Sequence, residues 1–245
     1  LESKYPVIIK EVEKLIKIVK SEEEVEKLTN YLQNMKTYVA DTINIILNIL
    51  KEEGFIEKEE NVTLTEKGLI ATQIQEVHSL VMASMLHKKK FNCISSSELA
   101  SLFSIFTSIR VSDIKKRFTT NKIENKYVSE LAQTIETYYD YYYNKDCQYQ
   151  LDIVEEYELT YDIVEDVYNW CQATNEQECN VVLSSVKEKG IFVGEFVKAL
   201  LKINNIASEI EKVCNITNNM ELLKNITDIP KLTMKYIVST QSLYL

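Results

Sequence analysis

Glycine and proline are scarce in this sequence, with four Gly and two Pro among 245 residues. A sheet of many strands needs tight turns, and these two residues are the ones that tight turns favour. The content of 45% hydrophobic and 27% charged residues is typical of a globular protein rather than a disordered segment. The sequence therefore predicts a mainly α-helical fold of one large domain or two small ones.

The sequence also lacks the residues of a nucleotide-hydrolysing or metal-dependent enzyme. A phosphate loop needs closely spaced glycines followed by Lys and Ser or Thr. Here the close glycines are Gly190 and Gly194, and Glu195 follows them. His78 and His87 are the only histidines, which argues against a histidine-based triad or a multi-histidine metal site. We expect no catalytic residue, cofactor or metal site in this chain.

The cysteines and the hydropathy of the sequence indicate the compartment in which the protein is expected. The five cysteines include no C-x-x-C pair, which indicates reduced thiols in a reducing compartment. The sequence opens on no basic and then apolar leader, and no apolar run approaches the roughly 18 residues that span a bilayer. We expect a soluble intracellular protein without membrane contact, in the cytoplasm or nucleus, or in a virion if the source is viral.

The charge balance limits the kind of nucleic-acid contact that the chain can make. A net charge of −9 and a pI near 5.0 are unlike those of a free-standing nucleic-acid binder, which neutralises many phosphates with Lys and Arg. Any RNA contact must therefore be local. Carboxylates such as Asp162 and Glu165 are expected on a solvated helix face, where most acidic side chains lie.

Residues 1–36 predict two charged helices. Apolar residues recur at helical spacing among Lys and Glu between residues 7 and 19. Ser21, with Glu24 three residues later, is typical of an N-cap that begins a second helix. These helices form a stalk or an antiparallel pair, or they are ordinary solvated helices.

Residues 37–68 combine a helix with a predicted β-hairpin. The helix runs to Gly54, and glycine suits the left-handed residue past a helix end. Two short β-prone segments, 55–58 and 62–65, then flank a polar turn. A helix followed by a small hairpin is typical of the end of a winged-helix domain, and we interpret residues 37–68 in this way.

Residues 69–245 predict a helical bundle. The expected helices cover residues 69–86, 128–143, 162–171 and 222–240, and Pro230 is expected to bend or restart the last of them. Ser95, with Glu98 three residues on, is typical of a further N-cap. Residues 172–188 are predicted to be a polar connection with a short helical piece.

Five tyrosines crowd the end of the predicted helix 128–143. Tyrosine can stack on bases, but Asp140 and Asp146 lie among these rings and would repel phosphate. We therefore favour partly buried tyrosines that pack against the bundle.

The clearest helical pattern begins after Gly194. Its apolar residues alternate steps of four and three, at Phe196, Leu200, Ile203, Ala207, Ile210 and Cys214. Lys198, Lys202 and Asn205 are spaced by four and three on another face. The pattern predicts a helix that packs on one side and presents cations on the other.

Several short motifs resemble those of one known family. They are Gly54-Phe55-Ile56, the segment from Val62 to Gly68, Val167-Tyr-Asn-Trp-Cys171, the segment from Gly190 to Lys198 with Leu201-Lys202, and the terminal Ser242-Leu-Tyr-Leu245. In this order they resemble the C-terminal region of Ski-like and exosome-associated DExH-box RNA helicases. That region comprises a winged helix and the DSHCT helical bundle, and the resemblance covers about residues 37–245.

The resemblance implies a bundle stacked on two RecA-like motor domains of the same polypeptide, which closes a channel for single-stranded RNA. ATP and Mg²⁺ would act in those motor domains, and the bundle would also contact RNA-processing protein partners. The helix matching residues 195–215 lines the channel in this family, and its RNA-facing positions correspond to Lys198 and Lys202. A third position falls on Arg110, where the family has an acidic residue, but a cation beside RNA is electrostatically favourable.

Two other functions stay open from the sequence. A winged-helix transcription regulator with a helical dimerisation domain would need a basic recognition helix, whereas residues 41–50 are apolar and uncharged at their centre. A helical scaffold that binds only protein partners is the second alternative.

Overall fold

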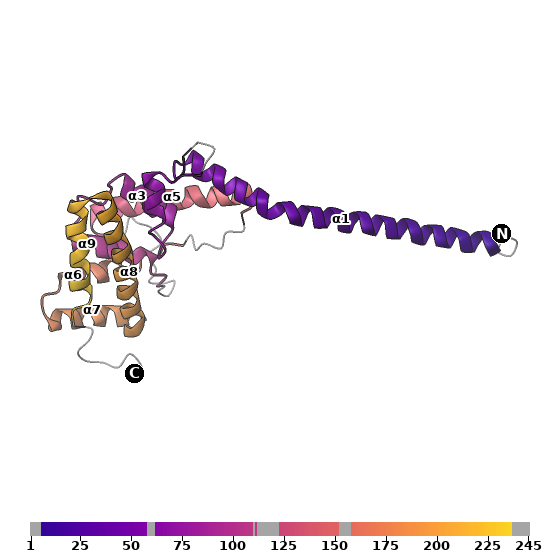
Figure 1. The fold of residues 1–245 in the computed structure, drawn as a ribbon. Helices are drawn as coiled ribbons and strands as arrows, with labels where there is room; N and C mark the ends of the chain where they lie inside the picture. Colours follow the sequence, from indigo (N-terminus) through magenta and orange to yellow (C-terminus); the bar gives the residue numbers. More distant parts are fainter. Residues whose placement is uncertain (1–5, 58–61, 110, 112–122, 152–157, 237–245) are drawn as a thin grey trace. The chain divides into compact units, whose positions relative to one another are not determined.

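The computed structural model describes residues 6–57, 62–109, 111, 123–151 and 158–236. The chain divides into two compact units, Leu1–Glu53 and Gly54–Leu245. The boundary between them falls inside the range 37–68. Helices dominate both units, as the composition predicts (Figure 1).

The first unit is one continuous helix, α1 (Pro6–Glu52), of 47 residues. The predicted break at Ser21 is wrong, because Ser21 lies inside this helix. Neither Gly nor Pro occurs between Val7 and Glu53, and a single Ser costs a helix interior only a fraction of a kcal/mol relative to good helix formers. Apolar side chains of α1 from Val12 to Val39 are exposed, as Val25 at 62% and Leu28 at 61% illustrate, whereas Ile49 near its end is buried.

The second unit begins with the segment in which a hairpin was expected. Gly54 has a φ of +73°, so the predicted left-handed glycine is confirmed. The hairpin prediction is not supported, because the described residues contain no strand and only one isolated antiparallel bridge, between Ile56 and Leu64. Its predicted turn, residues 58–61, lies outside the described residues. Beyond the bridge Thr65 caps a helix, which leaves too few extended residues for a ladder.

The region predicted as one helix over 69–86 contains two. Helix α2 (Glu66–Ala71) begins after Thr65, whose hydroxyl oxygen accepts a hydrogen bond from the Gly68 amide at 3.1 Å. Helix α3 (Ser79–His87) begins after His78, whose Nδ1 accepts from the Val81 amide at 3.4 Å. The break is not evident from the sequence, because histidine is not among the residues that typically cap helices.

Gly68 lies where α2 meets the extended segment after Gly54. A Cβ added at Gly68 would lie 2.0 Å from the carbonyl oxygen of Phe55, which no side-chain rotation can relieve. We expect Gly68→Ala to lower the free energy of unfolding by at least about 2 kcal/mol, as measured by urea denaturation. Gly54→Ala is the control, since a Cβ there meets nothing within 4 Å and only the left-handed backbone costs about 1 kcal/mol. A loss at Gly68 no larger than the loss at Gly54 would contradict this account of the contact.

The centre of the second unit is α4 (Ser96–Phe103), which continues into a 3-10 turn at Ser104–Phe106. The predicted cap is confirmed, because Ser95 and Glu98 form a reciprocal capping box. Leu99, Ala100, Leu102 and Phe103 are all fully buried. Helix α4 contacts α5 (Lys126–Tyr149), α6 (Val164–Gln172), α8 (Val193–Thr217) and α9 (Met220–Thr233).

The tyrosines of α5 divide between core and surface. Tyr139 and Tyr142 are buried, so the packing interpretation is confirmed for these two. Tyr141 and Tyr143 expose 42% and 52% of their surface. The tyrosine run therefore winds around the helix, with one face inside and one outside.

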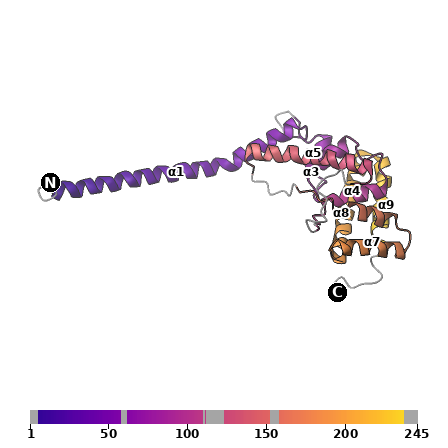
Figure 2. The ribbon, with the colours of Figure 1, turned by 180° about the vertical axis from the view of Figure 1, so that it is seen from behind.

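The last four helices form the rest of the bundle (Figure 2). The polar connection predicted for 172–188 is instead mostly α7 (Glu176–Glu188), which buries Cys179, Val182 and Val186 at helical spacing. Helices α8 and α9 pack closely along each other, and α7 runs across one end of the bundle (Figure 1). Helix α9 ends at Thr233, earlier than predicted, and Pro230 lies in its last turn.

Candidate nucleic-acid interface

The predicted buried stripe of α8 is confirmed. Its six residues are each at most 1% exposed. The Phe196 ring meets Trp170 of α6 edge-on at 5.7 Å, and the Trp170 indole N–H donates to the Thr233 carbonyl of α9 at 2.8 Å. Packing against α6 and α9 therefore fixes the rotation of α8 about its own axis, with its apolar face turned toward the core.

With α8 in this orientation, Lys198 and Lys202 lie on the side of the helix away from its buried apolar residues. Lys198 is exposed and Lys202 is half-buried. Within the described part of the chain, neither ammonium group pairs with a carboxylate or donates a hydrogen bond. The four-residue step separates the two Cα atoms by about 6 Å along the helix. The two side chains form a small cationic face on the first half of α8.

Asn205 does not join this cationic face as expected. Its side-chain amide donates to Glu76 Oε1 at 3.0 Å. One turn further on, Glu209 Oε2 accepts from the backbone amides of Gln75 and Glu76 at 3.0 and 3.1 Å. The connection between α2 and α3 thus contacts the polar face of α8 in its second half, at Asn205 and Glu209. The open part of this face carries Lys198 and Lys202, with the exposed Glu195 about one turn before Lys198.

A partly buried ion pair anchors the turn that leads into α8. Lys189 Nζ pairs with Asp166 Oδ2 and also donates to the Asp162 carbonyl at 3.0 Å. The Ser185 hydroxyl donates to Asp166 Oδ1 at 3.0 Å. Asp162 and Asp166 are each 4% exposed, so the expectation of a solvated face is wrong for Asp162. Sequence reasoning missed this pair because Lys and Asp 23 residues apart carry no local spacing signal.

Arg110, the third cation expected near RNA, lies outside the described residues. Its role therefore stays a prediction. Val111 is described, and its amide donates to Asp162 Oδ2 at 3.4 Å.

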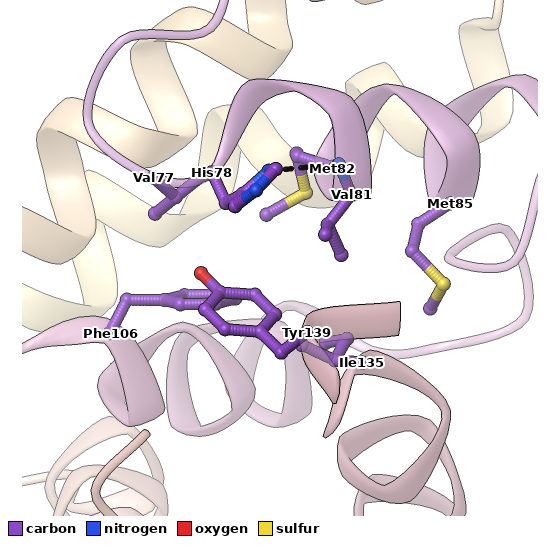
Figure 3. A pocket seen from close by; sticks show the side chains of 8 residues that line it. All are labelled: Val77, His78, Val81, Met82, Met85, Phe106, Ile135 and Tyr139. Carbon is purple, nitrogen blue, oxygen red and sulfur yellow. Dashed lines mark hydrogen bonds between the residues drawn. The ribbon is translucent and has the colours of Figure 1, made fainter. Parts of the chain in front are cut away.

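An apolar crevice separates α3 from α5 and does not serve as a ligand site. His78, Val81, Met82 and Met85 face Phe106, Ile135 and Tyr139 across it, with Val77 at its edge (Figure 3). The gap is too narrow for a water molecule. Burial lowers the pKa of His78 to about 4, which keeps the imidazole neutral and its Nδ1 free to accept the Val81 amide.

The described residues contain no group of three or more His, Cys, Asp or Glu side chains placed to hold a metal ion. In the same ranges, no helix combines the length and the apolar character that crossing a bilayer requires.

Together these features define a helical bundle whose longest core helix presents a small cationic face. The family model of the DSHCT (NUC185) domain matches residues 61–241. The match includes every helix from α2 to α9 and most of the chain, so the chain belongs to the DSHCT domain family. No curated protein matches the chain.

Proposed function

We propose that this chain is the C-terminal accessory region of an ATP-dependent RNA helicase and that α8 contacts single-stranded RNA through Lys198 and Lys202. The observation that carries the proposal is the orientation of α8. Its apolar stripe is buried at six positions, while both lysines point outward and pair with no described carboxylate. An ammonium group without a protein partner can neutralise a phosphate without first breaking an ion pair.

The family supports the helicase part of this proposal, because DSHCT domains occur in DExH-box helicases. In the proposed arrangement the bundle packs on RecA-like motor domains of a Ski-like helicase, where ATP and Mg²⁺ act. RNA-processing proteins are the further proposed partners. The proposed assignment of residues 37–68 to the end of a winged helix rests on the sequence resemblance, and the structure adds the left-handed Gly54 and one antiparallel bridge, between Ile56 and Leu64, but no strand among the described residues.

The charge distribution determines what kind of RNA contact this can be. The chain carries a net charge of −9, so attraction to RNA must come from local groups of cations, and the proposed contact uses Lys198 and Lys202. Lysine acts as a compact point charge and lacks the planar, bidentate geometry of arginine. Contacts of this kind position a strand through its backbone and carry no base sequence information. We therefore propose an RNA contact without sequence preference.

The test is RNA affinity of the intact helicase carrying Lys198→Glu and Lys202→Glu. We expect single-stranded RNA to bind about tenfold more weakly or worse at moderate salt, because two phosphate contacts become repulsive. The binding constant is measured by fluorescence anisotropy with a labelled oligonucleotide. The melting temperature should stay within a few degrees of the original, since neither side chain has a protein partner among the described residues.

Lys212→Glu provides a matched control on the same helix. Lys212 is exposed, and it lies close to the same face of α8, because fourteen residues complete nearly four turns. However, the α2–α3 connection is hydrogen-bonded to Asn205 and Glu209, so it lies between Lys212 and the two lysines on this face of α8. RNA affinity should change little in this variant. An equal loss at Lys212 would mean that only overall charge matters, and unchanged affinity in the double variant would favour a protein scaffold.

A further inference from the structure

The turn before α8 presents an exposed aromatic ring. Phe192 exposes 76% of its surface, more than any other large hydrophobic side chain in the described part of the chain. A phenylalanine has no polar atom that would make such exposure favourable. Isolated apolar residues are common on surfaces, so the argument also needs the setting of this ring.

The backbone that carries Phe192 is fixed on both sides. Gly190, with a φ of +83°, ends α7, and Ile191 is only 3% exposed in the core. The Phe192 amide donates to Glu195 Oε2 at 3.1 Å. Its carbonyl accepts from the Glu195 and Phe196 amides at 3.0 and 3.1 Å. The ring is therefore held out from an ordered turn, and a ligand that contacts it does not have to order that turn.

The surroundings of the ring match those of a single-stranded nucleic-acid site. Lys198 follows Phe192 by six residues, which is about 9 Å along the helix axis and about two-thirds of a turn around it. Sites for single strands combine cations for the backbone with aromatic side chains on which bases stack. The nearest carboxylate in sequence on α8 is Glu195, whose Oε2 accepts from the Phe192 amide and which keeps its negative charge. The combination favours a polynucleotide over an acidic peptide, which would use the cations but not the bare ring.

We propose that Phe192 is a platform on which one RNA base stacks while the neighbouring phosphate meets Lys198. This inference rests on the proposed function and adds a contact to the base where that function supplies only contacts to phosphates. Every base has a π-face, so the platform tolerates any sequence.

The experiment compares the intact protein with Phe192→Ala and Phe192→Trp on oligouridylate of fixed length. The alanine variant should bind about 5- to 150-fold more weakly. The tryptophan variant should bind at least as well as the original, and its added indole fluorescence should be quenched by the RNA. Val181→Ala is the control, because Val181 is 70% exposed but aliphatic, and it should leave the affinity unchanged.

Abasic RNA separates stacking from other causes. The original protein should lose affinity when a single base at the contact is removed, whereas Phe192→Ala should be insensitive to the same removal. An unchanged affinity in Phe192→Ala would overturn the stacking contact, as would an equal loss of affinity on fully abasic RNA. If the Lys198 and Lys202 reversals still weaken binding in that case, the proposed function stands alone. If they do not, both proposals fail.

Discussion

Phe196→Ala should lower the free energy of unfolding by about 3–5 kcal/mol, the usual range for removing a buried phenylalanine ring. The ring is 0% exposed, and it meets Trp170 edge-on at 5.7 Å. Trp170 in turn contacts α9, because its indole N–H donates a hydrogen bond to the Thr233 carbonyl. The loss therefore combines the transfer of the ring to water with a cavity between three helices.

Urea denaturation measures this loss directly. Trp170 is the only tryptophan of the chain, so its fluorescence reports on the packing of this centre. Phe192→Ala makes the same chemical change four residues earlier at a position that is 76% exposed, and it should alter stability by no more than about 0.5 kcal/mol. Similar losses for the two variants would show that the burial pattern of α8 is not the one described.

Lys189→Met should be nearly as damaging, at about 3–5 kcal/mol, because it leaves a buried carboxylate without its cation. Asp166 is 4% exposed, and its remaining hydrogen bond comes from the Ser185 hydroxyl. Methionine keeps most of the side-chain volume, so the loss is electrostatic rather than one of packing. The measurement is the free energy of unfolding in urea at neutral pH.

A double variant distinguishes the loss of one partner of the ion pair from the removal of both partners. Lys189→Met combined with Asp166→Leu should recover much of the lost stability, since replacing both partners removes the unpaired charge. The control Lys187→Met, at an exposed lysine in the last turn of α7, should stay within about 0.5 kcal/mol. If Lys189→Met behaved like Lys187→Met, the ion pair would contribute nothing to the turn before α8.

The sequence predicts the fold well where the signal is local and periodic. The stripe from Phe196 to Cys214 and the capping box at Ser95 are both found as expected. Prediction fails where two local signals compete. Ser21 reads as a cap, but it lies inside α1, since nothing before or after it breaks the helix. The split between α2 and α3 depends on His78, a residue whose role as a cap is rarely evident from spacing.

In the candidate site, too, helical spacing predicts some features, and contacts between distant segments decide the others. Helical spacing is enough to place Lys198 and Lys202 opposite the core stripe. It does not reveal that Asn205 bonds to Glu76, 129 positions away in the sequence. Nor does it distinguish Phe192 from a core phenylalanine, since an apolar residue beside a helix start usually packs inward. Contacts between distant segments decide these cases, and they arise only when the bundle assembles.

The salt dependence of RNA affinity tests most directly whether the two outward lysines of α8 bind phosphates. The logarithm of the binding constant is measured against the logarithm of salt concentration for the intact protein and for Lys198→Ala with Lys202→Ala. Loss of two phosphate contacts should make the slope shallower by about 1.4, at about 0.7 per phosphate of a single strand. Parallel lines of equal slope would contradict the account, whatever the change in affinity.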